Sequence, residues 1–237
     1  MPISRPLVLG AVLLAVAGGA DARGQLQTRQ TGIDMPAGVR AGRLVLANTG
    51  DKPVPAQIRV YKWTQEGGED ALDPSNELIA SPAIVEIAPG AEQLIRVVRA
   101  GAQPLTSEQA YRVVVDELPG DPDSEATNAV TVRMRFVLPA FVRAENAPVA
   151  NLACVLAAPV LTCTNSGGRA AQMGATTMLG DGGRKAELSP GLFGYVLAGR
   201  SRRWTLAPEA LKAVSAPTSL QVQLNGQPAT VALVRAP

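Results

Sequence analysis

Residues 111–119, Tyr-Arg-Val-Val-Val-Asp-Glu-Leu-Pro, and residues 128–138, Asn-Ala-Val-Thr-Val-Arg-Met-Arg-Phe-Val-Leu, are two apolar runs separated by a turn-rich stretch. In the second run apolar and polar residues alternate, and a period of two is typical of a β-strand with one buried face. The stretch between the runs contains Gly120, Asp121 and Pro122, which favour turns. The two runs therefore predict an antiparallel hairpin.

Shorter runs of the same kind precede this hairpin, and turn signals separate them. We expect strands within residues 43–46, 57–61 and 93–98, and turns at residues 48–51, 67–68, 73–76 and 88–90. The turns follow one another too closely for crossover helices, so an antiparallel β-sandwich is favoured. The one weak helical signal lies at residues 208–214.

The N-terminus has the layout of a secretory signal. Arg5 precedes an apolar run at residues 7–17, and an Ala-Asp-Ala pattern predicts cleavage after Ala22. The run is shorter than the roughly 20 residues that a membrane-spanning helix needs. We expect a signal peptide at residues 1–22 and no membrane insertion after its removal. A buried N-terminal strand is the alternative interpretation.

The rest of the chain is long enough for two sandwich domains of about 100 residues each. The apolar pattern breaks after residue 138, where Pro139, Arg143, Glu145 and Pro148 follow closely. We therefore place one domain at residues 23–142, a linker at 143–148 and a second, glycine-richer domain at 149–237.

The composition argues against several classes of function. The chain has no histidine and only 2 cysteines, so histidine-dependent triads and the usual zinc sites are excluded, and we expect no metal and no cofactor. A balance of 22 basic and 20 acidic residues gives no electrostatic footprint for nucleic acid. Asp116 and Glu117 are adjacent on a predicted strand and point to opposite faces, so they make a poor acid pair. We do not expect an enzyme.

Cys154 and Cys163 flank Ala157-Ala158-Pro159, which predicts a hairpin turn between them. Two cysteines that face each other across a hairpin are within the distance that a disulfide requires. An oxidising compartment would preserve the bond. We expect a structural disulfide, and two buried free thiols are the alternative.

A series of short motifs extends over nearly the whole chain after the signal. The motifs are Gly32–Gly38, Asn48–Asp51, Val60–Gln65, Glu77–Pro82, Ile87–Gly90, Gln93–Arg99, Tyr111–Pro119 and Gly191–Gly199 with Arg203-Trp204. Their order and spacing resemble the periplasmic fimbrial chaperones, and most closely the archaic branch associated with spore-coat-U-type subunits.

This resemblance implies an all-β protein with two immunoglobulin-like β-sandwich domains in a boomerang arrangement. It also implies a periplasmic chaperone of the chaperone-usher pathway, whose partners are pilus or fimbrial subunits and an outer-membrane usher. Such chaperones lend a strand to subunits that lack their last strand. A secreted pilus subunit or adhesin-like structural β protein is the alternative, although a subunit would usually be a single domain.

A lent strand must be an edge strand with apolar side chains at every second position. Val130, Val132, Met134 and Phe136 share one face of the second run. The resemblance implies that this face fills the groove of a subunit. The alternative is that the face packs in the chain's own core, most of all at Phe136.

An antiparallel pairing of the two runs is expected to bring Arg112 opposite residues near Met134 and Arg135, at the mouth of the interdomain cleft. The resemblance implies that the two guanidinium groups grip the C-terminal carboxylate of the subunit, for which arginine has a suitable fork geometry. Arg99 and Arg133 are second choices for this role. Two solvated surface arginines are the alternative.

The resemblance further implies that Arg96 and Glu117 belong to a charged set that holds the two domains at a fixed angle. Partly buried opposite charges need each other to offset desolvation. One position departs from the family pattern. Gly32 stands at about the place where another branch has a basic residue in its first strand, and glycine cannot supply that charge.

Overall fold

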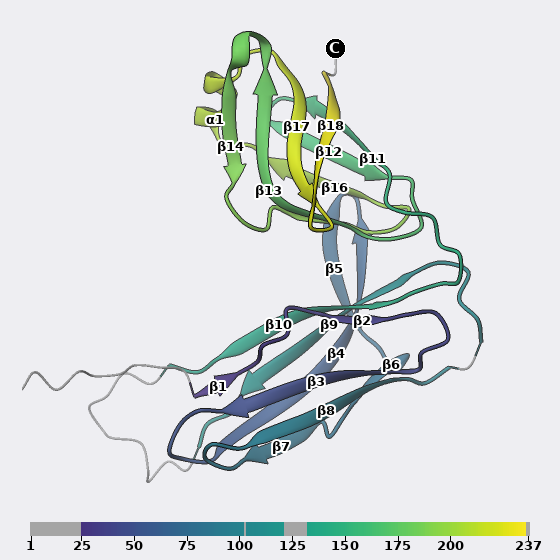
Figure 1. The fold of residues 1–237 in the computed structure, drawn as a ribbon, viewed down its shortest axis with the longest axis vertical. Coiled ribbons are helices and arrows are strands. Elements are labelled where there is room, and N and C mark those ends of the chain that lie inside the picture. The colour runs from purple at the N-terminus through teal and green to yellow at the C-terminus, as the bar shows by residue number, and fades with distance from the viewer. Residues whose placement is uncertain (1–24, 102, 121–131, 236–237) are drawn as a thin grey trace, which may run out of the picture.

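The protein is described by a computed structural model over residues 25–101, 103–120 and 132–235 (Figure 1). The expected signal peptide at residues 1–22 and Val130 of the expected lent strand lie outside these residues. The described chain is nearly all β-strand, as the sequence predicts, with one short helix, α1 (Pro208–Ala213), and one 3-10 turn, η2 (Asp181–Gly183). No helix in the described ranges is long and apolar enough to cross a membrane.

The first domain is a sandwich of two sheets. One sheet has the order β1-β3-β8-β6 and contains β1 (Leu26–Gln27), β3 (Ala41–Asn48), β8 (Glu92–Arg99) and β6 (Leu78–Ser81). The other has the order β2-β10-β9-β4-β5 and contains β2 (Ile33–Met35), β10 (Arg135–Val142), β9 (Gln109–Glu117), β4 (Val54–Glu66) and β5 (Glu69–Pro74), with β7 (Ile84–Ile87) paired to β4.

The core of this domain lies between its two sheets. Side chains alternate between the two faces of each strand, and one face of each strand points to this core. In β3, Leu44 and Leu46 are fully buried, whereas Arg43 is exposed. The opposite sheet contributes Tyr111 and Val113 of β9, which are also fully buried.

The second domain is built from one eight-stranded sheet that folds over a core of its own. Its order is β14-β13-β17-β18-β11-β12-β16, with β15 paired to β13. The strands are β11 (Leu152–Ala157), β12 (Val160–Asn165), β13 (Ala171–Gly180), β14 (Lys185–Ser189), β15 (Gly194–Val196), β16 (Ser201–Thr205), β17 (Pro217–Leu224) and β18 (Gln227–Arg235). Leu161 of β12, Met173 of β13 and Leu220 of β17 are fully buried in this core.

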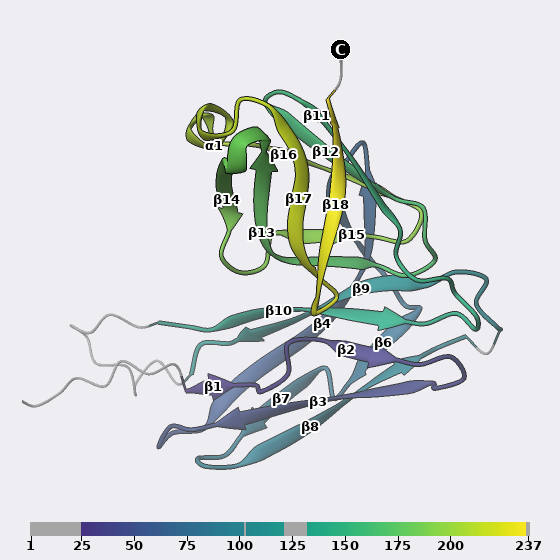
Figure 2. The ribbon, with the colours of Figure 1, turned by 45° about the horizontal axis from the view of Figure 1, so that its top comes forward.

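The two domains meet at an angle, as both views of the ribbon show (Figures 1 and 2). Strand β10 ends at Val142 and β11 begins at Leu152, and the expected linker at residues 143–148 lies within this interval. The β4–β5 hairpin projects out of the sandwich toward the second domain, where it contacts β16 (Figure 1). Its turn has Gly67 and Gly68 at φ 58° and 85°, a left-handed conformation that glycine adopts without strain.

The expected disulfide between Cys154 and Cys163 is present. The two cysteines are directly opposite each other in the β11–β12 hairpin, with a Cα–Cα distance of 4.1 Å. Both side chains are buried in the core of the second domain. The bond therefore joins two strands from within the core, and its role is structural.

Candidate functional site

Strand β10 is only partly covered along one of its edges. It pairs with β9 from Arg135 to Val142, but with β2 only from Ala140 to Val142. Among the described residues, no strand pairs with the second edge of the segment Arg135–Pro139. We call this segment the open edge.

The direction of the backbone groups in the open edge follows from one hydrogen bond. The carbonyl of Met134 accepts from the N–H of Glu117, so the backbone of Met134 faces β9. Because backbone direction alternates along a strand, the N–H and C=O groups of Arg135 and Val137 face away from β9. Pro139 ends the open edge and has no N–H to leave unpaired.

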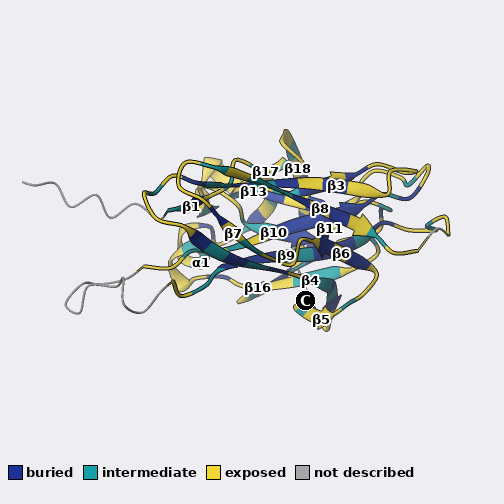
Figure 3. Cartoon of the chain, turned by 90° about the horizontal axis from the view of Figure 1, so that it is seen from below, coloured by how far each residue is buried: buried dark blue, intermediate teal, exposed yellow. Residues whose placement is uncertain are grey.

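The side chains expected to be lent to a partner differ in exposure. Val132 is 63% exposed, whereas Met134 and Phe136 are partly buried against the core of the first domain. In the free protein, Met134 and Phe136 therefore contact the chain's own core, which is the alternative that the sequence left open. Along β10 exposure gives way to burial, since Arg135 and Val137 are exposed and the residues from Leu138 to Val142 are buried. Figure 3 shows that buried residues, in dark blue, gather on the strands, and that exposed residues, in yellow, are common on the loops.

The prediction that Arg112 and Arg135 lie close together is wrong, because the hairpin has a different register from the expected one. Arg112 is opposite Pro139, and Arg135 is opposite Asp116. The two arginines are thus separated by four positions along the ladder, roughly 13 Å at the usual rise per residue.

Arg112 lies where the two domains meet. Its guanidinium stacks at 3.6 Å from the ring centre of Trp63 and lies 5.4 Å from that of Tyr195 in the second domain. In the described ranges no carboxylate lies within ion-pair distance of it. Burial lowers the pKa of Arg112, but an arginine keeps its charge at neutral pH. Arg112 is therefore a partly buried cation that no carboxylate in this part of the chain pairs with directly.

Arg135 has a different environment. Its Nε donates to Asp116, which also accepts from Arg59. Burial works against the charge of Asp116, but the two arginine hydrogen bonds lower its pKa. Arg135 is therefore already paired within the first domain, with a carboxylate that it shares with Arg59.

The second-choice arginines are not in the cleft. Arg99 is on β8, in the sheet that does not contain β10, and its Nη2 donates to the carbonyl of Gln103 at 2.6 Å. Arg133 is exposed just before β10 begins.

The expected pairing of Arg96 with Glu117 is also wrong. Arg96 is exposed on β8, where it is opposite Arg43 and Ser81, whereas Glu117 ends β9 in the other sheet. The carboxylate of Glu117 accepts from the N–H of Met134 and closes the end of the hairpin. Alternation along β8 directs Arg96 outward, away from the opposite sheet, so the two charges cannot meet.

The domains are instead joined through the tip of the β4–β5 hairpin. Gln65 is buried, and its amide donates to the carbonyl of Tyr195 at 2.8 Å and accepts from the N–H of Leu197 at 2.9 Å. The Gly68 carbonyl accepts from the N–H of Arg203 at 2.9 Å. The hairpin therefore lies against β15 and β16 of the second domain.

An apolar cluster lies beside these bonds. Trp63 and Phe141 of the first domain pack with Tyr195 of the second, and the rings of Trp63 and Tyr195 meet edge to face at 5.3 Å. Phe141 and Tyr195 of this cluster also line a cavity between the domains.

A buried carboxylate forms the second junction between the domains. Glu108 accepts from Arg143 and from the N–H of Ala170, which belongs to the second domain, and Arg143 also donates to Asp34 at 2.6 Å. Burial raises the pKa of Glu108, and Arg143 and the Ala170 N–H offset this effect only in part. Burial works against the charge of Arg143, but Asp34 and Glu108 raise its pKa.

Sequence reasoning missed this junction. Glu108 comes just before β9 and Arg143 just after β10, and their neighbours Gln109 and Val142 are directly opposite. The correct hairpin register would therefore have brought Glu108 and Arg143 together.

Two cavities lie between the domains. A cavity of about 240 Å³ is lined by Gly32, Pro139 and Tyr195 among others, and it begins at the end of the open edge. A Cβ added to Gly32 would come within 3.1 Å of Pro139, so this position favours glycine. A larger cavity of about 690 Å³ continues toward the hinge and shares Asp34 and Arg143 with the first. No described group of three or more His, Cys, Asp or Glu side chains is arranged to hold a metal ion.

The two sandwiches, the open edge and the cavities between the domains define a two-domain immunoglobulin-like protein with an unpaired strand edge at its domain junction. Residues 25–148 match the family described as pili and flagellar-assembly chaperone, PapD N-terminal domain. This chain belongs to that family. Its members are chaperones, a class without enzymatic activity.

Solved structures share the fold over nearly the whole chain. A chain of the CsuC-CsuE chaperone-tip adhesion subunit complex, from archaic chaperone-usher Csu pili of Acinetobacter baumannii, is 22% identical with a TM-score of 0.68, covering 90% of this chain and 99% of that one. The Salmonella enterica SafA pilin complex with the SafB chaperone gives 15% identity and a TM-score of 0.65, covering 90% and 99%. The E. coli chaperone DraB gives 16% and 0.59, covering 87% and 92%. No curated protein sequence matches the chain significantly.

The junction at Glu108 generates a stability prediction. Glu108→Ala should lower the free energy of unfolding by about 1 to 3 kcal/mol, because the Ala170 N–H and Arg143 lose a buried acceptor. In a double-mutant cycle, Glu108→Ala with Arg143→Ala should cost less than the sum of the single changes. Denaturant unfolding measures both quantities, and simple additivity would show that the two side chains do not act together.

The raised pKa of Glu108 adds a pH dependence to this prediction. A carboxyl whose pKa is raised by folding stabilises the fold below its unfolded pKa, and that contribution is lost as the pH rises through the folded pKa. The stability of the unaltered protein relative to Glu108→Gln should therefore decrease as the pH rises over this range. An unchanged difference would contradict the assignment.

Proposed function

We propose that this protein is a periplasmic chaperone that binds pilus subunits by donor-strand complementation and delivers them to an outer-membrane usher. The observation that carries this proposal is the open edge of β10, which leads directly into the interdomain cleft. The similarity to an archaic chaperone-usher protein supports the same pathway. Periplasmic location is supported by the family and by the signal expected at residues 1–22.

The open edge and an incomplete subunit both have unpaired backbone groups, and each can pair with the other. A sheet that lacks its last strand exposes an apolar groove and unpaired backbone groups, and both promote aggregation. The outward N–H and C=O groups of Arg135 and Val137 can pair with that backbone. Val132, which is largely exposed, is a side chain that can enter the groove without leaving the chaperone's own core.

The same pairing would bring the end of a subunit strand to Arg112. The open edge ends at Pro139, and Pro139 is directly opposite Arg112. A carboxylate near that point would lie on the face of the sheet where the guanidinium of Arg112 packs against Trp63 and Tyr195. We therefore assign the anchor for the subunit's C-terminal carboxylate primarily to Arg112, with Arg135 as the weaker candidate.

Delivery to an usher requires a second surface that stays free while β10 is occupied. The outer face of the β1-β3-β8-β6 sheet meets this requirement, because it is the face of the sandwich away from β10. Ile79 and Val98 are opposite each other on this face and are 49% and 37% exposed. Arg43 and Arg96, which are both positively charged, lie directly opposite each other on neighbouring strands of this sheet. This combination suits a partner surface with apolar and acidic groups.

The lent strand is tested by Val132→Asp. This change should abolish subunit co-purification, because an unpaired charge would enter an apolar groove. The thermal unfolding midpoint of the free protein should change little, since Val132 is largely solvated. Val234→Asp is the matched control, because Val234 is 62% exposed on β18 in the second domain, and it should leave both quantities nearly unchanged.

A collapsed fold in the Val132→Asp protein would assign Val132 to the chain's own core. A normal fold with normal capture would remove Val132 from the subunit interface. Either result would contradict the proposal.

The anchor is tested by Arg112→Ala and Arg135→Ala. Loss of a charge-assisted hydrogen bond costs about 1.5 to 3 kcal/mol, so Arg112→Ala should weaken subunit binding by about tenfold to a hundredfold. Arg135→Ala should have the smaller effect, because the guanidinium of Arg135 is already engaged by Asp116. Equilibrium binding to purified subunit measures the effect of each change. A larger loss of affinity in Arg135→Ala than in Arg112→Ala would assign the anchor to Arg135 instead.

A further inference from the structure

The chain crosses from one sheet of the first domain to the other between β1 and β2. Residues 28–32, Thr-Arg-Gln-Thr-Gly, make this crossing, and we call them the crossing segment. None of these residues is buried, whereas Leu26 before them and Ile33 after them lie in the core. Packing therefore fixes the two ends of the crossing segment and leaves its middle to polar contacts.

One side chain of the crossing segment binds it to β3. Nε2 of Gln30 donates to the carbonyl of Arg43 at 2.7 Å, and Oε1 accepts from the N–H of Val45 at 2.7 Å. The side chain thus pairs with β3 as the backbone of a neighbouring strand would. A cavity of about 500 Å³, lined by Thr28, Arg29 and Gln30 among others, lies along this contact, so the segment is not packed tightly against β3.

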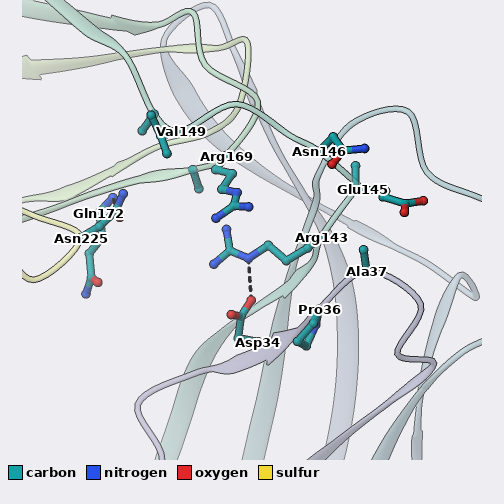
Figure 4. Close-up of a pocket in the computed structure, with 13 residues that line it drawn as sticks. Asp34, Pro36, Ala37, Arg143, Glu145, Asn146, Val149, Arg169, Gln172 and Asn225 are labelled. Carbon is teal, nitrogen blue, oxygen red and sulfur yellow. Dashed lines mark hydrogen bonds and ion pairs between the residues drawn. The ribbon is translucent and has the colours of Figure 1, made fainter.

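The crossing segment is also in register with the open edge. Strand β2 pairs in parallel with β10, with Ile33 opposite Ala140, and a hydrogen bond from Arg143 to Asp34 holds β2 in place (Figure 4). If this register continued toward the N-terminus, residues 28–32 would lie opposite the whole of the open edge. The crossing segment therefore has the right length to cover the open edge by extending β2.

Such an extension would pair the free backbone groups of β10. The carbonyl of Met35 accepts from the N–H of Arg143 at 2.9 Å, so the backbone of Met35 faces β10. Because backbone direction alternates along a strand, the backbone groups of Thr31 and Arg29 would face β10 as well. They would meet the N–H and C=O of Val137, which are the groups that the open edge offers to a subunit.

Two side chains oppose this extension. Every second residue of an extended β2 would point to the core side, as Ile33 does, and Arg29 is one of these residues. An inward-pointing charge is one means by which proteins block pairing at a strand edge. The second side chain is Gln30, which can leave β3 only by giving up both of its hydrogen bonds.

We propose that Arg29 and Gln30 are positioning residues that keep β2 short and so leave the open edge of β10 free for a subunit. The inference rests on the proposed function for what the edge captures, whereas the state of the edge is a property of the free protein. Without these two side chains, the crossing segment would cover the edge itself.

The experiment compares the double variant Arg29→Val, Gln30→Val with Gln27→Val. The double variant removes the inward charge and the contact with β3, so β2 should extend along β10. In the free double variant, hydrogen exchange of the Val137 amide should slow by about tenfold or more. Subunit affinity should fall by a similar factor, because a covered edge must open before a subunit can bind.

Gln27→Val is the matched control. Gln27 is an exposed glutamine of β1 whose side chain donates to Thr49 at 3.1 Å, and the change leaves both opposing side chains in place. It should exchange and bind as the unaltered protein does. Adding Thr31→Pro to the double variant should restore fast exchange of Val137 and subunit binding, because proline has no N–H to pair with β10.

A merely structural role of Arg29 and Gln30 predicts a different result. The double variant would then lose stability, and exchange at Val137 would be unchanged or faster. That outcome, a double variant that does not fold, or a failure of Thr31→Pro to restore exchange and binding would each overturn the inference.

The exchange measurement also separates the inference from the proposed function. If the unaltered protein and Gln27→Val bind no subunit while Val137 is protected in the double variant, the proposed function fails and the inference about the edge stands. If both bind the subunit and Val137 exchanges equally fast in all variants, only the inference fails.

Discussion

The backbone groups of Arg135 and Val137 that face away from β9 are the constraint on which the rest of this structure depends. A strand edge with unpaired N–H and C=O groups is a template for pairing with another chain. Here the edge is short, because β2 covers it from Ala140 onward and Pro139 removes one donor. The protein thus keeps an edge that is long enough to guide a partner strand and too short to form an extended sheet by itself.

The junction between the domains gives this edge a direction. The β4–β5 hairpin holds the second domain through Gln65, and Glu108 holds it through the N–H of Ala170. These bonds join the two domains, and Arg112 lies at the same junction against the rings of Trp63 and Tyr195. A partner that pairs with the open edge is therefore led toward fixed positive charges, and the position of those charges depends on both domains.

The sequence predicted the fold well because the fold depends on local signals. Alternating runs and turn residues identified the strands of the first domain, and the spacing of Cys154 and Cys163 identified their hairpin. The site was predicted less well, because its geometry depends on register. A shift of a few residues in the β9–β10 hairpin separates Arg112 from Arg135 and brings Glu108 beside Arg143. Contacts between Gln65 and the second domain carried no local signal, since they join residues more than a hundred positions apart.

The family resemblance had a similar limit. It implied the class of protein correctly, but the charged pair assigned to Arg96 and Glu117 is not formed, because the two residues lie in different sheets. The contact of Gln30 with β3 had no signal in the sequence at all. It depends on how the chain crosses between the two sheets, and its partners Arg43 and Val45 are 13 and 15 positions away.

Residue-resolved hydrogen exchange of β10, in the free protein and in complex with a subunit, tests the central claim most directly. The amides of Phe136 and Leu138 face β9 and should be protected in both states. The amides of Arg135 and Val137 should exchange quickly in the free protein and become protected in the complex. Equal exchange of Arg135 and Val137 in both states would contradict the claim that this edge is lent to the subunit.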